Sequence, residues 1–224
     1  MQESLRIGVL HVPHADRGFD DERFHACVKQ ARATLDDSGT SPLAADFVRL
    51  SALLLVLQSR FREARERIVA EVLPHVPAQR ASQRPMTHWS LALAELGLGN
   101  RTAALEQIRT ADAMAAGSVP LIRWLMAPTS AAILMACDRI ADGLALADAL
   151  EAEMGDRVPL LLAGRVEICR AFGAWLEGRR EDALSWLRRG LALQSSNPYA
   201  GRLLLPDPRF HHLLALAAER GVEP

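Results

Sequence analysis

The residues best suited to metal chemistry lie near the N-terminus: His11, His14, His25 and Cys27. Imidazole nitrogen and thiolate sulfur are the ligands that Zn²⁺ prefers, and the His-x-x-His and His-x-Cys spacings are compatible with one site. The same residues are also ordinary in an irregular arm followed by one face of a helix, and a motif without its structural context is a weak indication. We expect no metal and no cofactor, and this cluster stays open as an alternative.

No other group of residues forms a recognisable catalytic motif. The chain has no glycine-rich phosphate loop, no Gly-x-Ser-x-Gly motif and no His-Glu-x-x-His motif. His211 and His212 are adjacent, so on a helix their side chains point about 100° apart and we expect one to face solvent. Cys137 and Cys169 fall within expected helices, where a thiol usually packs as a small hydrophobe. We therefore expect no catalytic residues, with an enzyme or the regulatory subunit of one as an alternative.

The composition is that of a folded, soluble domain. The 224 residues are 50% hydrophobic and 24% charged, with a formal net charge of −1. This balance argues against a general nucleic-acid or membrane-surface binder. The three cysteines form no Cys-x-x-Cys pair, which indicates reduced thiols and a cytoplasmic location. The apolar run from Leu53 to Leu57 is too short to span a membrane, and no N-terminal segment has the pattern of a signal peptide.

Small residues recur at a fixed period along the chain. One set is Ala64, Ala104, Gly143 and Ala183, with spacings of 40, 39 and 40 residues. Another set lies twelve residues earlier in each case: Ala52, Ala92, Ala131 and Ala171. Helices cross closely only where small side chains meet, so each pair predicts a hairpin of two amphipathic helices. Such a hairpin cannot bury its apolar face alone and must stack on its neighbours, which predicts an all-α solenoid.

Turn and cap signals set the expected boundaries. An N-terminal arm covers residues 1–18 and a helical-repeat domain covers 19–224. The domain begins with a helix, and its repeats and final capping helix are expected at about 42–73, 85–116, 119–154, 157–194 and 207–220. Ser-Pro, Val-Pro and Asp-Pro steps open several of these helices, because a cap followed by proline in the first turn favours helix initiation.

The turn between the two helices of a hairpin has a similar sequence in three places. GRREDAL begins at Gly178, SRFREAR at Ser59 and GNRTAAL at Gly99. Over roughly residues 42–195 this pattern resembles the tetratricopeptide repeat. The period near 40 is longer than the usual 34, and is more similar to the long-helix variant in the sensor arrays of bacterial transcriptional activators of the maltose-regulator type. The resemblance implies a right-handed array of about four repeats whose first helices line a concave groove.

Two residues depart from the pattern of this family. Gly143 stands where the other three hairpins have alanine, and Glu95 stands where the family has an apolar residue. Both departures fall within otherwise regular helices, so they raise the question of what each residue contacts in the folded chain.

Aligning the first helices on their small residues gives a set of candidate partner-binding residues along the groove. They are Arg49 and Leu53 in the first repeat, Met86, Trp89 and Leu93 in the second, Trp124 in the third, and Arg165, Ile168, Phe172 and Trp175 in the fourth. This strip is apolar and aromatic with an arginine toward each end, and Trp and Arg are favoured anchors at binding surfaces. For any one tryptophan, packing between repeats is an equal alternative.

The sequence therefore predicts a non-enzymatic interaction or scaffold module. Its expected partner is a protein or peptide that binds in the groove as a helix or an extended segment, because stacked hairpins present extended surfaces. A regulatory sensor array that binds a small molecule or peptide is the alternative from a different class. We expect no nucleic-acid and no membrane partner, and self-association as a homo-oligomer through the N-terminal arm is left open.

Overall fold

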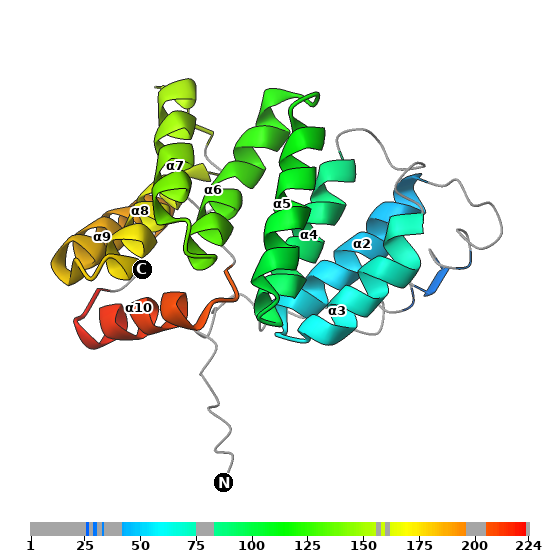
Figure 1. The fold of residues 1–224 in the computed structure, drawn as a ribbon, viewed down its shortest axis with the longest axis horizontal. Coiled ribbons are helices and arrows are strands. Elements are labelled where there is room, and N and C mark those ends of the chain that lie inside the picture. The colour runs from blue at the N-terminus through cyan, green and yellow to red at the C-terminus, as the bar shows by residue number, and fades with distance from the viewer. Residues whose placement is uncertain are drawn as a thin grey trace, which may run out of the picture.

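The computed structural model describes residues 26, 29, 30 and 33 and the ranges 42–74, 83–155, 158–159, 162–195 and 205–222. In these residues the regular secondary structure is helical and no strand occurs (Figure 1). The predicted all-α class is thus confirmed for this part of the chain. The N-terminal arm (1–18) and the cluster of His11, His14, His25 and Cys27 lie outside the described residues.

The helices follow one another in pairs. They are α2 (Pro42–Leu57) with α3 (Phe61–Arg67) and its π-helical extension η1 (Ile68–Val72), α4 (Arg84–Gly97) with α5 (Arg101–Ala115), α6 (Pro120–Ala136) with α7 (Ile140–Met154), α8 (Arg165–Leu176) with α9 (Arg180–Ser195), and α10 (Pro208–Glu219). In Figure 1 the pairs succeed one another from α2 and α3 to α8 and α9, and α10 lies beneath α8 and α9. The first helices pack in a row, α2 on α4, α4 on α6 and α6 on α8. None of the described helices is long and apolar enough to cross a membrane.

One turn geometry joins the two helices of every pair. Each turn contains one residue with left-handed φ: Ser59 (58°), Gly99 (81°), Asp138 (63°) and Gly178 (79°) in chain order. In each turn the following amide donates to the carbonyl five residues earlier, as Arg60 does to Leu55 at 2.8 Å and Arg179 does to Ala174 at 2.9 Å. This left-handed cap satisfies carbonyl groups at the end of the first helix. The left-handed turn residues therefore recur at the same spacings, 40, 39 and 40 residues, as the small residues of the sequence pattern.

The small residues of the sequence pattern lie in the interior. The seven alanines of the pattern are each 0% exposed, and Gly143 is buried. Between α6 and α7 the approach is so close that a Cβ added to Gly143 would lie 2.5 Å from the carbonyl oxygen of Ala131. An alanine would clash with that backbone, which explains why Gly143 departs from the alanine pattern.

Glu95 of α4, the second departure from the family pattern, is buried, and two polar side chains donate hydrogen bonds to its carboxylate. Arg65 Nε of α3 donates to Oε1 at 2.7 Å, and Asn100 Nδ2 donates to Oε2 at 2.7 Å. A buried carboxylate is tolerated when donors surround it. Glu95 therefore links the first pair of helices to the second by an ion pair. An apolar residue at this position could link them only by packing.

The fourth pair begins later than the sequence predicts. α8 starts at Arg165 rather than near residue 157, because Gly164 takes a left-handed φ of 79° at the N-cap position and the helix follows it. A Cβ on Gly164 would also clash with the carbonyl oxygen of Gly190 in α9. Two glycines thus allow the start of α8 to lie directly against α9, a contact that the pattern of small residues did not predict.

Helix α10 packs across the last pair. Phe210 meets Phe172 of α8 edge to face, with ring centroids 5.4 Å apart. Asp207 caps the helix by accepting a hydrogen bond from the Arg209 amide at 2.8 Å. The Arg209 side chain donates to the Ala136 carbonyl oxygen and to Asp138 in the turn between α6 and α7. α10 (208–219) falls in the range 207–220 where the sequence predicts a capping helix, and it contacts α8 and α9.

Candidate functional site

The ten residues predicted to line a groove fall into two groups. Five are buried: Arg49, Trp89, Leu93, Ile168 and Phe172. Five are half-buried: Leu53, Met86, Trp124, Arg165 and Trp175. Leu93 and Phe172 are both 0% exposed, so they offer no surface to a partner as the chain is packed here. We assign these two residues and Ile168 to the core.

Helix α4 is covered on every side over its second half. Residues 89–96 are all buried, and eight successive residues make more than two turns of helix. The neighbours of α4 are α2, α3, η1, α5 and α6. The resemblance implied a groove open along all four first helices, and the central part of α4 leaves no such opening. The exposed apolar surface near these residues lies instead on α2.

Three leucines form an apolar stripe along α2. Leu50 is 41% exposed, Leu57 is 48% exposed, and Leu53 between them is half-buried. The steps of three and four residues place them on one side of the helix, and Leu50 and Leu57 are separated by about 10 Å along the axis. A single exposed leucine needs no explanation. A line of three along one helix is a candidate contact surface for another apolar element.

Arg49 lies one helical turn before Leu53 and is buried although it is charged. Its side chain is 6% exposed. Nη2 donates to Gln83 Oε1 at 3.4 Å, and Asp46 Oδ1 lies 3.9 Å from Nε, beyond hydrogen-bond distance. Nε and Nη1 have no hydrogen-bond acceptor. Burial lowers the pKa of the Arg49 guanidinium, and the nearby charge of Asp46 opposes that shift.

Trp89 adds another buried donor from the neighbouring helix. Trp89 and Arg49 each lie three residues before a buried alanine of the repeat pattern, Ala92 and Ala52, so they occupy equivalent positions on two helices in contact. The Trp89 indole Nε1 is buried without an acceptor. Leaving a buried donor unpaired costs about 1–3 kcal/mol. An acceptor supplied by a partner would therefore be favourable here.

The candidate site is this combination, named the α2–α4 surface: Arg49, Leu50, Leu53, Leu57 and Trp89. The alignment of first helices found Arg49, Leu53 and Trp89, but it missed Leu50 and Leu57. Their signal in the sequence was the spacing from Leu50 through Leu53 to Leu57 within a helix that is almost entirely apolar. A helix that is apolar all round does not reveal which face is exposed until its neighbours are known.

Arg165, predicted at the other end of the groove, contacts α6. Pro128 lies inside α6, where it cannot donate to the helical ladder and crowds the preceding turn. Arg165 Nη1 donates to the Leu125 carbonyl oxygen at 3.4 Å, and Cys169 Sγ donates to the Pro128 carbonyl oxygen at 3.1 Å. Burial lowers the pKa of Arg165 and raises the pKa of the Cys169 thiol to about 12. Both residues hold α8 against α6, and Cys169 is the buried thiol that the sequence predicted.

Arginines cover two tryptophans of the last pair. The Arg180 guanidinium carbon lies 5.8 Å from the ring centre of Trp175. Trp186 has Arg170 at 5.2 Å and Arg189 at 5.5 Å from its ring centre. Stacking of this kind contributes about 0.5–1 kcal/mol at exposed sites. Trp175 is thus half-buried beneath a side chain of α9 rather than open as a groove residue.

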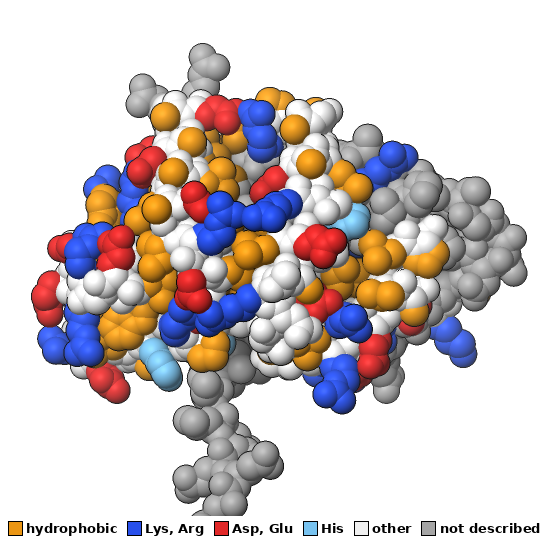
Figure 2. Space-filling view, viewed as in Figure 1, with side chains coloured by type: hydrophobic (Ala, Val, Ile, Leu, Met, Phe, Trp, Pro, Cys, Tyr) orange, Lys and Arg blue, Asp and Glu red, His pale blue; other side chains and the backbone are white. Residues whose placement is uncertain are grey.

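Acidic side chains of α7 hold one of these arginines in place. Arg170 Nη2 donates to Asp148 and to Glu151, at 2.6 Å in each case. On the face shown in Figure 2, acidic and basic side chains are interspersed, with apolar side chains between them. This mixture agrees with the balanced charge of the sequence.

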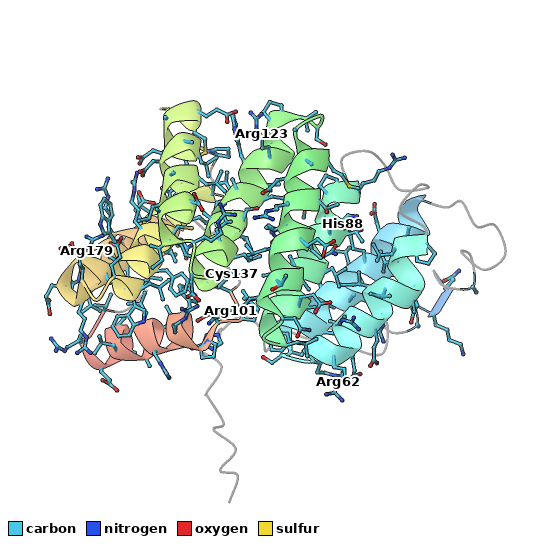
Figure 3. All side chains as sticks on the ribbon, viewed as in Figure 1. Arg62, His88, Arg101, Arg123, Cys137 and Arg179 are labelled. Carbon is cyan, nitrogen blue, oxygen red and sulfur yellow. The ribbon has the colours of Figure 1, made fainter. Side chains whose placement is uncertain are left out.

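The turn after α6 and helix α10 contain the remaining groups of chemical interest. Cys137 lies beside Arg101 (Figure 3), with Sγ 3.6 Å from the Arg101 carbonyl oxygen. His211 is half-buried and His212 is exposed, as expected for adjacent residues of a helix, and burial lowers the pKa of His211. In the ranges that the structure describes, no three His, Cys, Asp or Glu side chains are grouped to hold a metal ion.

Comparison of the chain with models of protein families gives no match, and comparisons with curated proteins and with solved structures give none either. The α2–α4 surface is therefore defined by burial, spacing and hydrogen bonding within this chain.

Proposed function

We propose that the chain is a non-enzymatic interaction module that binds a protein or peptide partner on the α2–α4 surface. The observation that carries this proposal is the combination of an exposed leucine stripe with buried N–H donors of Arg49 and Trp89 that lack acceptors. Leucines supply apolar contact area, and a few placed donors fix the orientation of what binds.

The arrangement of the helices supports this function. We propose that the pairs form a right-handed solenoid of four repeats similar to tetratricopeptide repeats, which accounts for the common turn geometry and for the row of first helices. In such an array each pair contacts only its neighbours and the surface is extended. Among the described helices α2 packs mainly on α3, η1 and α4, and Leu50 and Leu57 of its leucine stripe are exposed.

A regulatory sensor for a small anionic molecule is a second candidate. The unpaired donors of Arg49 and Trp89 favour it, because an anion of any size could accept their hydrogen bonds. A saturable rise in melting temperature on adding a metabolite, with no protein present, would support the sensor over the interaction module.

Affinity purification of the tagged full chain tests the proposal when it is combined with surface variants. Leu50→Arg and Leu57→Arg place a charge on the stripe, and both positions are exposed, so folding should be unaffected. Leu121→Arg is the matched control, because Leu121 on α6 is 46% exposed. A stoichiometric partner that is lost with the α2 variants and kept with the control supports the proposal. A partner kept by all three variants places the binding surface elsewhere.

A further inference from the structure

We infer that the α2–α4 surface takes an amphipathic helix of a partner protein, and that an acidic side chain of this helix pairs with Arg49. The inference rests on the proposed function, because it names the structural element and the chemistry of the partner at the same surface.

The shape of the stripe favours a helix over an extended segment. Leu50, Leu53 and Leu57 lie along one side of α2 over about two helical turns. A second helix with apolar residues at positions i, i+3 or i+4, and i+7 presents a ridge of matching length, and such ridges pack into the grooves beside one another. An extended segment points successive side chains to opposite faces, so only every second residue would reach the leucines.

Arg49 determines the polar contact. A carboxylate at the fork between Nη1 and Nη2 would replace the 3.4 Å contact with Gln83 by two charge-assisted hydrogen bonds. Because Arg49 lies four residues before Leu53, the acidic residue of the partner belongs about one turn from the residue that contacts Leu53.

The charge around Arg49 favours one acidic residue rather than a cluster. The Asp46 carboxylate already lies 3.9 Å from Nε and partly balances the guanidinium. If the partner brought two carboxylates, the second would be repelled by Asp46, because Arg49 is the only cation among the residues of the α2–α4 surface. To meet a partner, the Arg49 guanidinium must give up its hydrogen bond to Gln83, and at 3.4 Å this bond is long and weak.

A library of displayed helical peptides tests the inference with the full chain as bait. Peptides of about 15 residues carry leucine at i, i+3 and i+7, and the other positions vary. The best binder is then synthesised with its acidic residue as Glu or as Gln, and the affinity of each form is measured for wild type and for Arg49→Met. Methionine keeps the length and apolar character of the arginine stem.

We expect selected peptides to carry one acidic residue a turn from a leucine. Glu→Gln in the peptide and Arg49→Met in the protein should each weaken binding about 10- to 100-fold, the usual effect of a charged hydrogen bond. Made together, the two changes should cost no more than either alone, because they remove the same contact. Arg49→Met should melt no lower than wild type, since it removes buried donors that lack acceptors. Leu50→Arg should abolish binding, and the control Leu121→Arg should not.

Two other results separate the inference from the proposed function. If helical peptides bind but neither Glu→Gln nor Arg49→Met changes their affinity, the acidic contact is absent and the inference is overturned, while the interaction module stands. If extended, proline-containing peptides are selected instead, the helical partner is overturned. If the full chain binds no peptide of either kind, the proposed function fails as well.

Discussion

Asp138 and Arg209 are 71 positions apart in the sequence, yet Asp138 Oδ1 accepts a hydrogen bond from Arg209 Nη1 at 2.9 Å. The other carboxylate oxygen accepts from Arg101 Nη1 at 2.6 Å. Asp138 thus joins the turn between α6 and α7 to the start of α5 and to the start of α10. It also takes a φ of 63°, where glycine would be less strained. The position carries a side chain because the carboxylate holds three segments together.

Replacing Asp138 with Asn should loosen α10 without unfolding the chain. Asparagine tolerates the left-handed conformation as well as aspartate does, so the change isolates the ion pairs. Because these pairs are exposed, we expect a loss of about 0.2–1 kcal/mol in the free energy of unfolding. Hydrogen exchange of α10 amides should become faster, while amides of α4 keep their protection. Unchanged exchange in α10 would show that the contact between Phe172 and Phe210 holds the helix alone.

The same carboxylate predicts how stability depends on pH. The hydrogen bond from Arg209 lowers the pKa of Asp138, and the hydrogen bond from Arg170 lowers the pKa of Glu151. A carboxyl group whose pKa is lowered on folding stabilises the protein above its unfolded pKa, near 4, and this contribution is lost as pH falls through the folded value.

Urea unfolding measures this effect when it is carried out at several pH values between about 6 and 2.5, a range that extends from above the carboxyl pKa to below it. The midpoint should fall with decreasing pH below about 4, and Asp138→Asn with Glu151→Gln should make the fall shallower. Glu219→Gln, an exposed change in the last turn of α10, is the control. A wild-type profile that is no steeper than that of the double variant would contradict the prediction.

Local sequence signals predicted the helical class and the turns between paired helices, because a hairpin is a local structure. The alanines at each crossing, the left-handed turn residues and the Asp-Pro start of α10 all act within one hairpin or helix. Contacts between distant segments were not predictable in this way. Phe172 against Phe210 depends on how α10 meets α8, and no single hairpin contains that information. Gly164 against Gly190 lies within the α8–α9 pair, but outside the repeating spacing of small residues.

The candidate site was predicted less well than the fold, for a related reason. Alignment on small residues shows which residues share a helix face, but not whether that face is covered. Leu93 and Phe172 share the face of Trp89 and Arg49 and lie wholly in the core. Glu95 departs from the pattern of apolar residues, and only the structure shows that Arg65 and Asn100 donate hydrogen bonds to it.

Gly143→Ala should destabilise the protein although alanine favours helix. The added Cβ would lie 2.5 Å from the Ala131 carbonyl oxygen, and overpacking of this kind typically costs about 1–3 kcal/mol. Over most of that range the cost exceeds the gain in helix propensity, about 1 kcal/mol. Gly117→Ala is the control, because nothing lies within 4 Å of a Cβ at that position. Equal urea midpoints for the two variants would mean that α6 and α7 are further apart than the structure shows.

The pair of Glu95 and Arg65 should show a coupling energy in a double-mutant cycle. The Glu95 side chain is 7% exposed and the Arg65 side chain is 46% exposed, so the pair is only partly screened by solvent. We expect Glu95→Gln and Arg65→Met to interact by about 1 kcal/mol when the free energies of unfolding of the single and double variants are compared. Additive effects would show that Asn100 alone satisfies the buried carboxylate.

Arg165→Ala and Trp175→Ala decide how far the binding surface extends along the first helices. If binding is confined to the α2–α4 surface, neither variant should change the affinity for a partner that Leu50→Arg abolishes. Both should still lower the melting temperature. Arg165→Ala removes the hydrogen bond to the Leu125 carbonyl oxygen. Trp175 is half-buried beneath Arg180, so Trp175→Ala should lower the free energy of unfolding by less than the roughly 3–5 kcal/mol typical of a fully buried tryptophan.

Affinity and melting temperature must therefore be measured together for these two variants. Weaker binding by Arg165→Ala, with a melting temperature close to wild type, would show that the partner also contacts α8, at the end of the groove that the sequence predicted. Trp175→Ala is the less direct probe, because loss of its stacking with Arg180 can disturb α9. Arg180→Ala, which removes the same stacking and keeps the tryptophan, separates a contact with the partner from a change in α9.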